Sequence, residues 1–312
     1  MTQPLHIAFF GECMIELSGN PLKKGFGGDT LNTALYLSRL TANTNTSVSY
    51  ATGLGEDALS QELIQAWQSE GISTSLVQTY QDKVPGLYMV ETDAQGERSF
   101  IYWRDTAAVK SYFAQAELSK LEQAMAQGEI DYVYLSGISL AILDDSSKKR
   151  LISALKAFSE SDGKVVFDNN FRPQLWSAEQ AKHWYGELLP IVDIALITED
   201  DDQRVWGDEE SVEARSERFG CPETVIKRGC EPCKVIWTEQ ASHSAYVSAE
   251  RVTNVVDTCA AGDSFAAGYL AGRLSGQRAQ ASAALGHHLA STVIQFSGAI
   301  IPQEEMAHLI LA

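Results

Sequence analysis

The sequence lacks a disulfide framework, a long hydrophobic run and a basic leader segment. Its five cysteines are an odd number scattered over 312 residues, which suits a reducing compartment better than a secreted scaffold. No apolar run approaches the length that crosses a bilayer. The opening residues carry no basic region followed by an apolar stretch, as a signal peptide would. We therefore expect a cytoplasmic protein that makes no contact with membranes.

Positive charge is also scarce. Lysine and arginine number 24 against 41 aspartate and glutamate, so the formal net charge is −17. A nucleic-acid-binding surface is basic, so this balance argues against DNA or RNA as a partner. An anionic small molecule remains compatible, because a few local arginines act at short range despite the global charge.

What is present is an alternation of buried strands and helices. The composition is 45% hydrophobic with 8 prolines, which is typical of a globular protein large enough to bury a sizeable core. Helical patterns such as 58–70, closed by Gly71, separate the apolar runs. This order predicts a doubly wound, mostly parallel α/β sheet flanked by helices, in one domain over residues 1–312. The predicted strands are 5–10, 47–51, 132–135, 165–167, 194–197 and 224–226.

One region breaks the alternation. Residues 87–92 and 98–104 flank a turn at 93–96 and predict a hairpin, and 14–17 reads as a further strand. We expect a small antiparallel β lid formed by about 12–26 and 84–108, which would exclude water from a reaction. An ornamental hairpin and a subunit interface are the alternatives. A lid whose outer face dimerises would be a lid and a subunit interface at once, so we expect a homo-oligomer, a dimer or larger.

The most informative segment is 257–265, with sequence DTCAAGDSF. The small residues Ala260, Ala261 and Gly262 allow backbone N–H groups to approach an anion, and the helix that follows adds its positive dipole end. Asp263 lies inside this turn, where it could accept a proton from a hydroxyl that attacks a phosphoryl group. The alternative is an ordinary helix start with a first-turn acid. An alanine at position 260 predicts that no positive φ is needed there.

A pair of glycines precedes the helical run 33–40. Gly27 and Gly28 would let peptide groups approach a polyol, and Asp29 and Asn32 could bond its hydroxyls. A flexible turn and helix cap is the alternative. A second glycine segment, 53–57, lacks the third glycine of a dinucleotide fingerprint and predicts a turn capped by Asp57.

Two arginines stand near candidate sugar-binding positions. Alternation places Tyr102 and Arg104 on one face of the hairpin, where Arg104 could bind a carboxylate while Tyr88 and Tyr102 bind hydroxyls. Arg172 follows a buried strand, and ligands bind beyond the carboxyl ends of such strands. Ordinary aromatic packing and a surface ion pair are the respective alternatives.

Cys230 and Cys233 form a C-x-x-C pattern that alone would suit a redox or zinc half-site. No second pair supplies further ligands, and the adjacent His287 and His288 point to different faces of a helix. We interpret the cysteines as a turn between two strands.

These motifs together resemble the ribokinase-like (PfkB) sugar kinase family. Segment 257–265 resembles its D-T-x-G-A-G-D signature, with alanine at 260, and 27–32 resembles its G-G-x-x-x-N signature. Segments 11–17, 85–88, 134–143, 168–173 and 291–299 are similar to one branch, which phosphorylates 2-keto-3-deoxygluconate. The resemblance covers essentially the whole chain.

The resemblance implies a ribokinase-like fold and ATP-dependent phosphorylation of this sugar acid with Mg²⁺, Asp263 being the general base. A monovalent cation such as K⁺ near Asp257 and the 297–298 loop follows from family analogy alone. Asp201 stands where many relatives have a residue linked to magnesium through water. The implied substrate contacts are Gly28, Asp29, Asn32, Tyr88, Tyr102, Arg104 and Arg172, and the implied nucleotide contacts are Asn170, Thr198, Lys227, Arg228 and Gly229.

Three other functions remain open. A neutral-sugar kinase of the same family, such as a fructokinase or ribokinase, would not need two arginines. A non-catalytic sugar-acid sensor would not turn over ATP. A C-x-x-C oxidoreductase would lose activity on substitution of Cys230.

Overall fold

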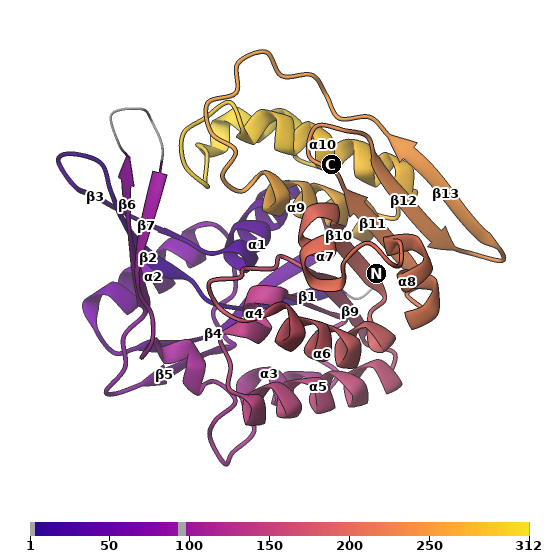
Figure 1. Ribbon diagram of the computed structural model, residues 1–312. Helices are drawn as coiled ribbons and strands as arrows, with labels where there is room; N and C mark the ends of the chain where they lie inside the picture. The colour runs from indigo at the N-terminus through magenta and orange to yellow at the C-terminus, as the bar shows by residue number, and fades with distance from the viewer. Residues whose placement is uncertain (1–3, 93–97, 312) are drawn as a thin grey trace.

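The computed structural model describes residues 4–92 and 98–311, and a nine-stranded sheet forms its centre (Figure 1). The strand order is β13-β12-β11-β10-β9-β8-β1-β4-β5. Neighbours from β11 to β5 pair in parallel, and β12 and β13 continue the sheet antiparallel. The strands are β1 Leu5–Phe10, β4 Thr46–Gly55, β5 Val77–Tyr80, β8 Tyr132–Ser136, β9 Lys164–Asp168, β10 Ile194–Thr198, β11 Glu223–Lys227, β12 Cys233–Thr238 and β13 Ser242–Val247.

Helices cover both faces of this sheet, because alternate residues of each strand are apolar on opposite sides. In β1, Ile7 and Phe9 belong to one hydrophobic cluster, whereas Ala8 and Phe10 belong to the other. The first face is covered by α1 Asp29–Leu40, α2 Ala58–Ser69, α9 Ala261–Leu274 and α10 Ala279–Val293. The second is covered by α3 Lys120–Ala126, α5 Asp145–Glu160 and α6 Ala178–Leu188, with α4 Gly137–Ala141, α7 Glu199–Trp206 and α8 Val212–Phe219 near the strand ends.

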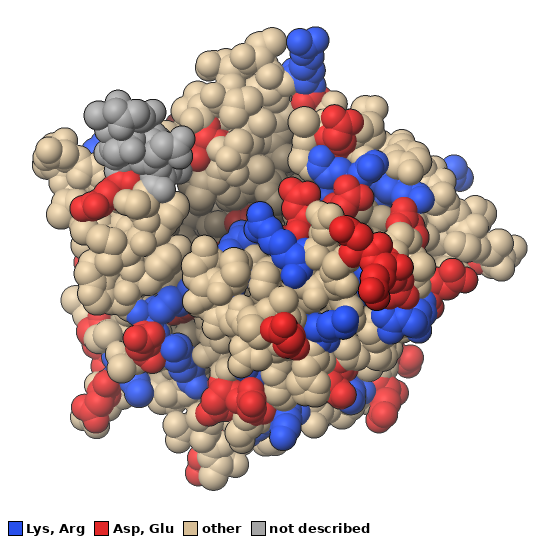
Figure 2. All heavy atoms as spheres, in the orientation of Figure 1, with Lys and Arg blue, Asp and Glu red and all other residues tan. Residues whose placement is uncertain are grey.

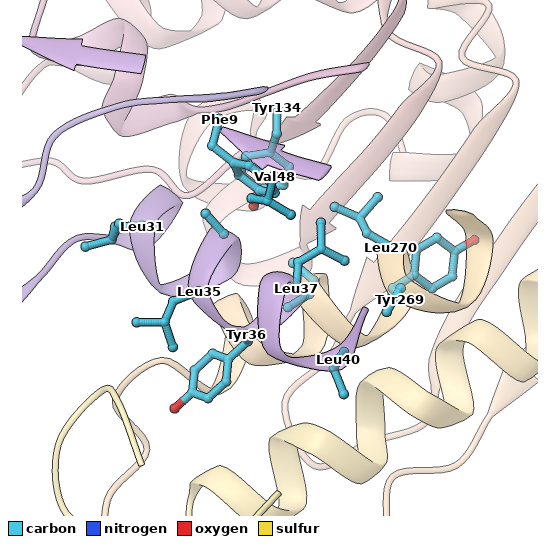
Figure 3. Close-up of a cluster of buried hydrophobic side chains, with 14 of the residues drawn as sticks. Phe9, Leu31, Leu35, Tyr36, Leu37, Leu40, Val48, Tyr134, Tyr269 and Leu270 are labelled. Carbon is cyan, nitrogen blue, oxygen red and sulfur yellow. The ribbon is translucent and has the colours of Figure 1, made fainter. Parts of the chain in front are cut away.

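The hydrophobic cluster on the first face of the sheet holds α1 and α9, the two helices whose N-termini reach the site. Leu37 of α1 and Leu270 of α9 lie together beneath β1 and β4 (Figure 3). Helices α9 and α10 also approach closely, since a β-carbon on Gly268 would lie 2.7 Å from the α-carbon of Gly286. Packing of this kind tolerates little movement, so the N-termini of α1 and α9 are held on a rigid base.

A second, four-stranded sheet stands off the main body and is called the lid sheet here (Figure 1). Its order is β3-β2-β6-β7, with antiparallel pairs β2–β3 and β6–β7 joined by parallel pairing of β2 with β6. The predicted turn at 93–96 lies outside the described residues. The strands are β2 Met14–Ser18, β3 Lys23–Gly27, β6 Gly86–Thr92 and β7 Arg98–Trp103.

The six predicted strands all belong to the central sheet, and the lid sheet is present as expected. Strands β5, β12 and β13 were not among the predicted strands, and some boundaries differ. Strand β3 was not expected, and α1 begins at Asp29 rather than near 33 because the extended backbone of Gly28 ends the preceding strand. Asp57 caps α2 as predicted, accepting a hydrogen bond from the Ser60 N–H at 3.0 Å. None of the helices within 4–92 and 98–311 combines the length and apolar character that a bilayer-spanning helix needs.

Candidate active site

A cavity of about 500 Å³ lies between the lid sheet and the carboxyl ends of the parallel strands. Figure 2 shows the hollow, with basic side chains gathered beside it. Ligands of open α/β sheets bind at this edge, because the loops leaving successive parallel strands converge there. Its lining includes Gly28, Asp29, Asn32, Tyr88, Tyr102, Asp168, Asn170, Arg172, Thr198, Asp201, Arg204, Lys227 and 258–263.

The turn before α9 forms one wall. Asp257 ties it to the 297–298 loop, accepting hydrogen bonds from Cys259 N–H at 3.0 Å and from Gly298 N–H at 2.7 Å. Ala260 has φ 59° and ψ 16°, the left-handed conformation. The prediction that position 260 needs no positive φ is therefore wrong. The turn must reverse direction within one residue before the helix, and alanine adopts this geometry at a cost of about 1–2 kcal/mol.

Helix α9 presents its N-terminus to the cavity. Ala260 is its N-cap, and no side chain in the described structure caps it, which leaves first-turn N–H groups available to an anion. The Lys227 ammonium adds a positive charge, because its Nζ lies 3.7 Å from where a β-carbon on Gly262 would stand. Backbone dipoles and a lysine thus converge on the turn of 260–262.

Asp263 faces the same space from the first turn of α9. Its Oδ2 accepts a hydrogen bond from Asn32 Nδ2 at 2.8 Å, which joins the N-termini of α1 and α9. Burial, followed by the charge of Asp29, raises the pKa of Asp263 to about 7. The other amide atom, Asn32 Oδ1, is buried with no hydrogen-bond partner among the described residues and can accept from a ligand hydroxyl.

Hydrogen bonds link further polar side chains on the floor of the cavity. Asn170 Nδ2 donates to Asp29 Oδ2 at 2.7 Å, and Lys227 Nζ donates to Asp168 Oδ2 at 2.6 Å. Burial raises the pKa of Asp29, an effect that hydrogen bonds from Ser136 and Asn170 partly offset. Asn170, which the resemblance implies as a nucleotide contact, lines this cavity beside Asp29.

The lid sheet supplies the aromatic wall. Tyr88 and Tyr102 are directly opposite in β6 and β7, with ring centroids 6.0 Å apart. The Tyr88 hydroxyl donates to Glu16, which leaves its oxygen free to accept from a ligand. At Gly28 a β-carbon would lie 2.1 Å from the Glu12 carbonyl oxygen, so glycine is required there for close approach.

The structure separates the two predicted arginines. Arg104 is not among the described residues that line the cavity; its guanidinium pairs with the buried carboxylate of Glu12, near the start of the lid sheet. Arg172 does line the cavity, as predicted from its position after β9. Beside it lies Arg204, which the sequence analysis missed. Its only sequence signal is its position three residues after Asp201, on a helix that begins at a strand end.

A second cavity of about 680 Å³ adjoins the first. It is lined by four of the five residues that the resemblance implies as nucleotide contacts, namely Thr198, Lys227, Arg228 and Gly229. The two cavities share Thr198, Lys227, Thr258, Ala261 and Gly262, so the anion-binding turn lies at their junction. The sequence analysis did not find the apolar wall, formed by Val252, Val255, Phe265, Ala290 and Ile294.

The described residues fit a metal ion coordinated mainly by water and phosphate better than one coordinated by several protein side chains. They contain no group of three or more His, Cys, Asp or Glu side chains arranged to hold a metal. Asp201 is the predicted water-linked ligand. Its Oδ2 lies 3.5 Å from Arg172 Nη1, and its Oδ1 lies 3.6 Å from Arg204 Nη1. Mg²⁺ usually keeps several waters and binds through substrate phosphates, which this carboxylate-containing cavity permits.

Cys230 lies in the turn between antiparallel β11 and β12, as predicted, whereas Cys233 is the first residue of β12. Cys230 is exposed and Cys233 is buried, and both are free thiols. Burial raises the pKa of Cys233 to about 11, which disfavours the reactive thiolate.

Comparisons with known proteins agree with this geometry. A family sequence model described as "pfkB family carbohydrate kinase" matches residues 5–306. The chain is 48% identical to 2-dehydro-3-deoxygluconokinase of Dickeya dadantii and 46% identical to that of Escherichia coli K12. Each match covers 96% of this chain and 98% of the relative. The crystal structure of a fructokinase with bound ATP from Xylella fastidiosa has a TM-score of 0.80 at 20% identity, covering 97% of each chain.

Proposed function

Because the chain belongs to the pfkB family of carbohydrate kinases, we propose that it phosphorylates 2-keto-3-deoxygluconate with ATP. The product is 2-keto-3-deoxy-6-phosphogluconate. One observation carries the proposal: Asp263 and an uncapped helix N-terminus lie where a sugar-sized cavity meets a larger, apolar-walled one. The names of the relatives that match nearly the whole chain supply the sugar acid.

The proposed reaction takes place where the two cavities join. ATP occupies the larger cavity with its phosphates toward Lys227 and the turn of 260–262, whose N–H groups stabilise charge on the transferring group. The C6 hydroxyl of the sugar acid approaches Asp263, which accepts its proton as the oxygen attacks the γ-phosphorus. The bond from the γ-phosphorus to the bridging oxygen breaks, and ADP leaves with those electrons.

The sugar acid is held from both sides in this proposal. Asp29 and Asn32 bind hydroxyls from the main domain, and the close backbone at Gly28 lets the sugar lie against it. Tyr88 and Tyr102 contact it from the lid sheet, and Arg172 binds its carboxylate. A direct carboxylate contact by Arg104 remains a prediction, since that side chain pairs with Glu12 here.

Metal ions complete the proposal. Mg²⁺ bound to the phosphate oxygens would neutralise charge as the phosphoryl group transfers. A monovalent cation such as K⁺ would be held near Asp257 and Gly298, two residues that the structure joins by a hydrogen bond. Replacing K⁺ by choline in the assay should then lower turnover, whereas equal rates would remove that cation from the proposal.

We also place the subunit interface on the outer face of the lid sheet, opposite Tyr88 and Tyr102. Ile101 and Trp103 alternate with the inner residues along β7 and are exposed. Large apolar side chains grouped on one face are typical of a protein–protein contact.

The test is ADP release from the purified protein with ATP and Mg²⁺, comparing 2-keto-3-deoxygluconate with gluconate, fructose and ribose. Strong preference for the keto-deoxy acid is expected. Asp263→Asn should lower its turnover by about 10²–10⁴-fold with ATP affinity and circular dichroism unchanged. Preference for a neutral sugar would identify a different family activity, and no ADP release with any substrate would favour the sensor.

A further inference from the structure

The first cavity contains more negative than positive charge. Among its described lining residues the basic side chains are Arg172, Arg204 and Lys227, against the five carboxylates of Asp29, Asp168, Asp200, Asp201 and Asp263. A sugar carboxylate entering this cavity therefore needs a local cationic group whose hydrogen-bond donors are not already used.

Lys227 and Arg104 do not meet that need. Lys227 Nζ lies 2.6 Å from Asp168 and faces the turn where the two cavities join. Arg104 pairs with Glu12, and both side chains are almost completely buried outside the cavity. Arg104 is therefore directed to a protein carboxylate, and Lys227 is directed to Asp168 and to the turn that would bind the phosphates.

The pair Arg172 and Arg204 is held differently. One carboxylate, Asp201, lies between them, at 3.5 Å from Arg172 Nη1 and 3.6 Å from Arg204 Nη1. Both separations exceed the usual 2.7–2.9 Å of a charge-assisted hydrogen bond. Arg172 Nη1 also donates to the Phe171 carbonyl oxygen at 3.0 Å, so Asp201 and this carbonyl orient the guanidinium groups while most of their donors stay available to a ligand. The two guanidinium charges are only partly balanced by the single carboxylate of Asp201, so this group of three side chains carries a net charge of +1.

The position of this pair favours a sugar carboxylate over a nucleotide phosphate. Residues shared by both cavities mark where the phosphates meet the sugar, and they include Thr198, Lys227 and Gly262. Arg172 and Arg204 line the first cavity only. They are also about half exposed, which leaves them room to close on an entering ligand.

We propose that Arg204 is a second carboxylate-binding residue for the sugar acid, acting beside Arg172, with Asp201 as the residue that positions both. The inference rests on the proposed function. It also gives Asp201 a different role from the water-linked magnesium contact that the sequence suggested.

Arg204→Met tests the inference, because methionine keeps an unbranched apolar stem and removes only the charge and the donors. The KM for 2-keto-3-deoxygluconate should rise about 10- to 100-fold, as expected for loss of a charge-assisted hydrogen bond, with kcat and the KM for ATP nearly unchanged. Arg204→Lys should recover part of the loss by retaining the charge.

Arg218→Met is the matched control. Arg218 lies on the next helix, is half exposed and pairs with Glu210, but it is not among the described residues lining either cavity. Its removal should leave all kinetic constants unchanged. Asp201→Asn should raise the KM for the sugar acid without raising the Mg²⁺ concentration needed for half-maximal rate; a raised Mg²⁺ requirement would return Asp201 to the metal.

The outcomes separate the two proposals. A wild-type enzyme that prefers fructose or ribose would overturn the proposed function, and this inference with it. A wild-type enzyme active on the sugar acid, with its KM unchanged in Arg204→Met, would overturn the inference alone. So would an equal rise in the KM values for both substrates.

Discussion

At the residue scale, the protonation of Asp263 controls the proposed chemistry. Burial and the nearby charge of Asp29 raise its pKa to about 7, and only the deprotonated form can accept the hydroxyl proton. Above that pH the base is ionised, and below it protonation removes the base.

We therefore predict that kcat/KM for the sugar acid falls about tenfold per pH unit below about pH 7 and is level above it. Asp29→Asn should move this acidic limb to lower pH, because it removes a charge that raises the pKa of Asp263. Asp200→Asn is the control: Asp200 lines the same cavity, is exposed, and should leave the limb in place. A flat profile between pH 5.5 and 8.5 would count against Asp263 as the base.

The backbone of Ala260 leads to a second prediction. Ala260 is left-handed, whereas Ala261 is the first helical residue of α9. Ala260→Gly relieves a left-handed conformation, and Ala261→Gly only adds freedom to the unfolded chain. The first variant should be more stable than the second by about 1 kcal/mol, measured by urea unfolding. Equal stabilities would show that the turn relaxes without strain.

At the scale of elements, the pair formed by Glu12 and Arg104 joins the end of β7 to the segment between β1 and β2. Burial raises the pKa of Glu12, and the adjacent Arg104 charge partly offsets this. The pair therefore fastens the lid sheet where it meets the main sheet.

Arg104→Met should destabilise the protein by about 3–5 kcal/mol, because it leaves a buried carboxylate without its partner. The double variant with Glu12→Gln should recover part of that stability in thermal unfolding. If Arg104 also contacts the sugar acid, the double variant will keep a raised KM for it. A single variant as stable as the wild type would mean that the pair does not fasten the lid sheet.

At the scale of the whole molecule, the exposed lid face predicts association. Trp103→Lys places a charge in the proposed interface and should shift the protein to a smaller species in sedimentation velocity. Leu118→Lys is the control, since Leu118 and Trp103 are both 55% exposed but Leu118 lies before α3, away from the lid sheet. A monomeric wild-type protein would exclude this interface.

The parts of the structure that depend on local periodicity and on small residues could be predicted from the sequence. Alternating apolar runs were enough to predict six strands of the central sheet, and the run from Ala260 to Gly262 was enough to predict a turn that starts a helix with Asp263 in its first turn. Both signals lie within about ten residues, where backbone geometry fixes which groups are neighbours.

Which side chains meet could not be predicted from the sequence, because it depends on tertiary packing. Asn32 bonds Asp263 from 231 residues away, and Arg104 pairs with Glu12 across 92 residues. Arg204 joined Arg172 in the cavity although no motif includes it. Such partners depend on how helices and loops pack over the sheet, and the left-handed backbone of Ala260 depends on the same closure. The sequence identifies candidate charges, but packing decides which are neutralised within the protein and which remain free for a substrate.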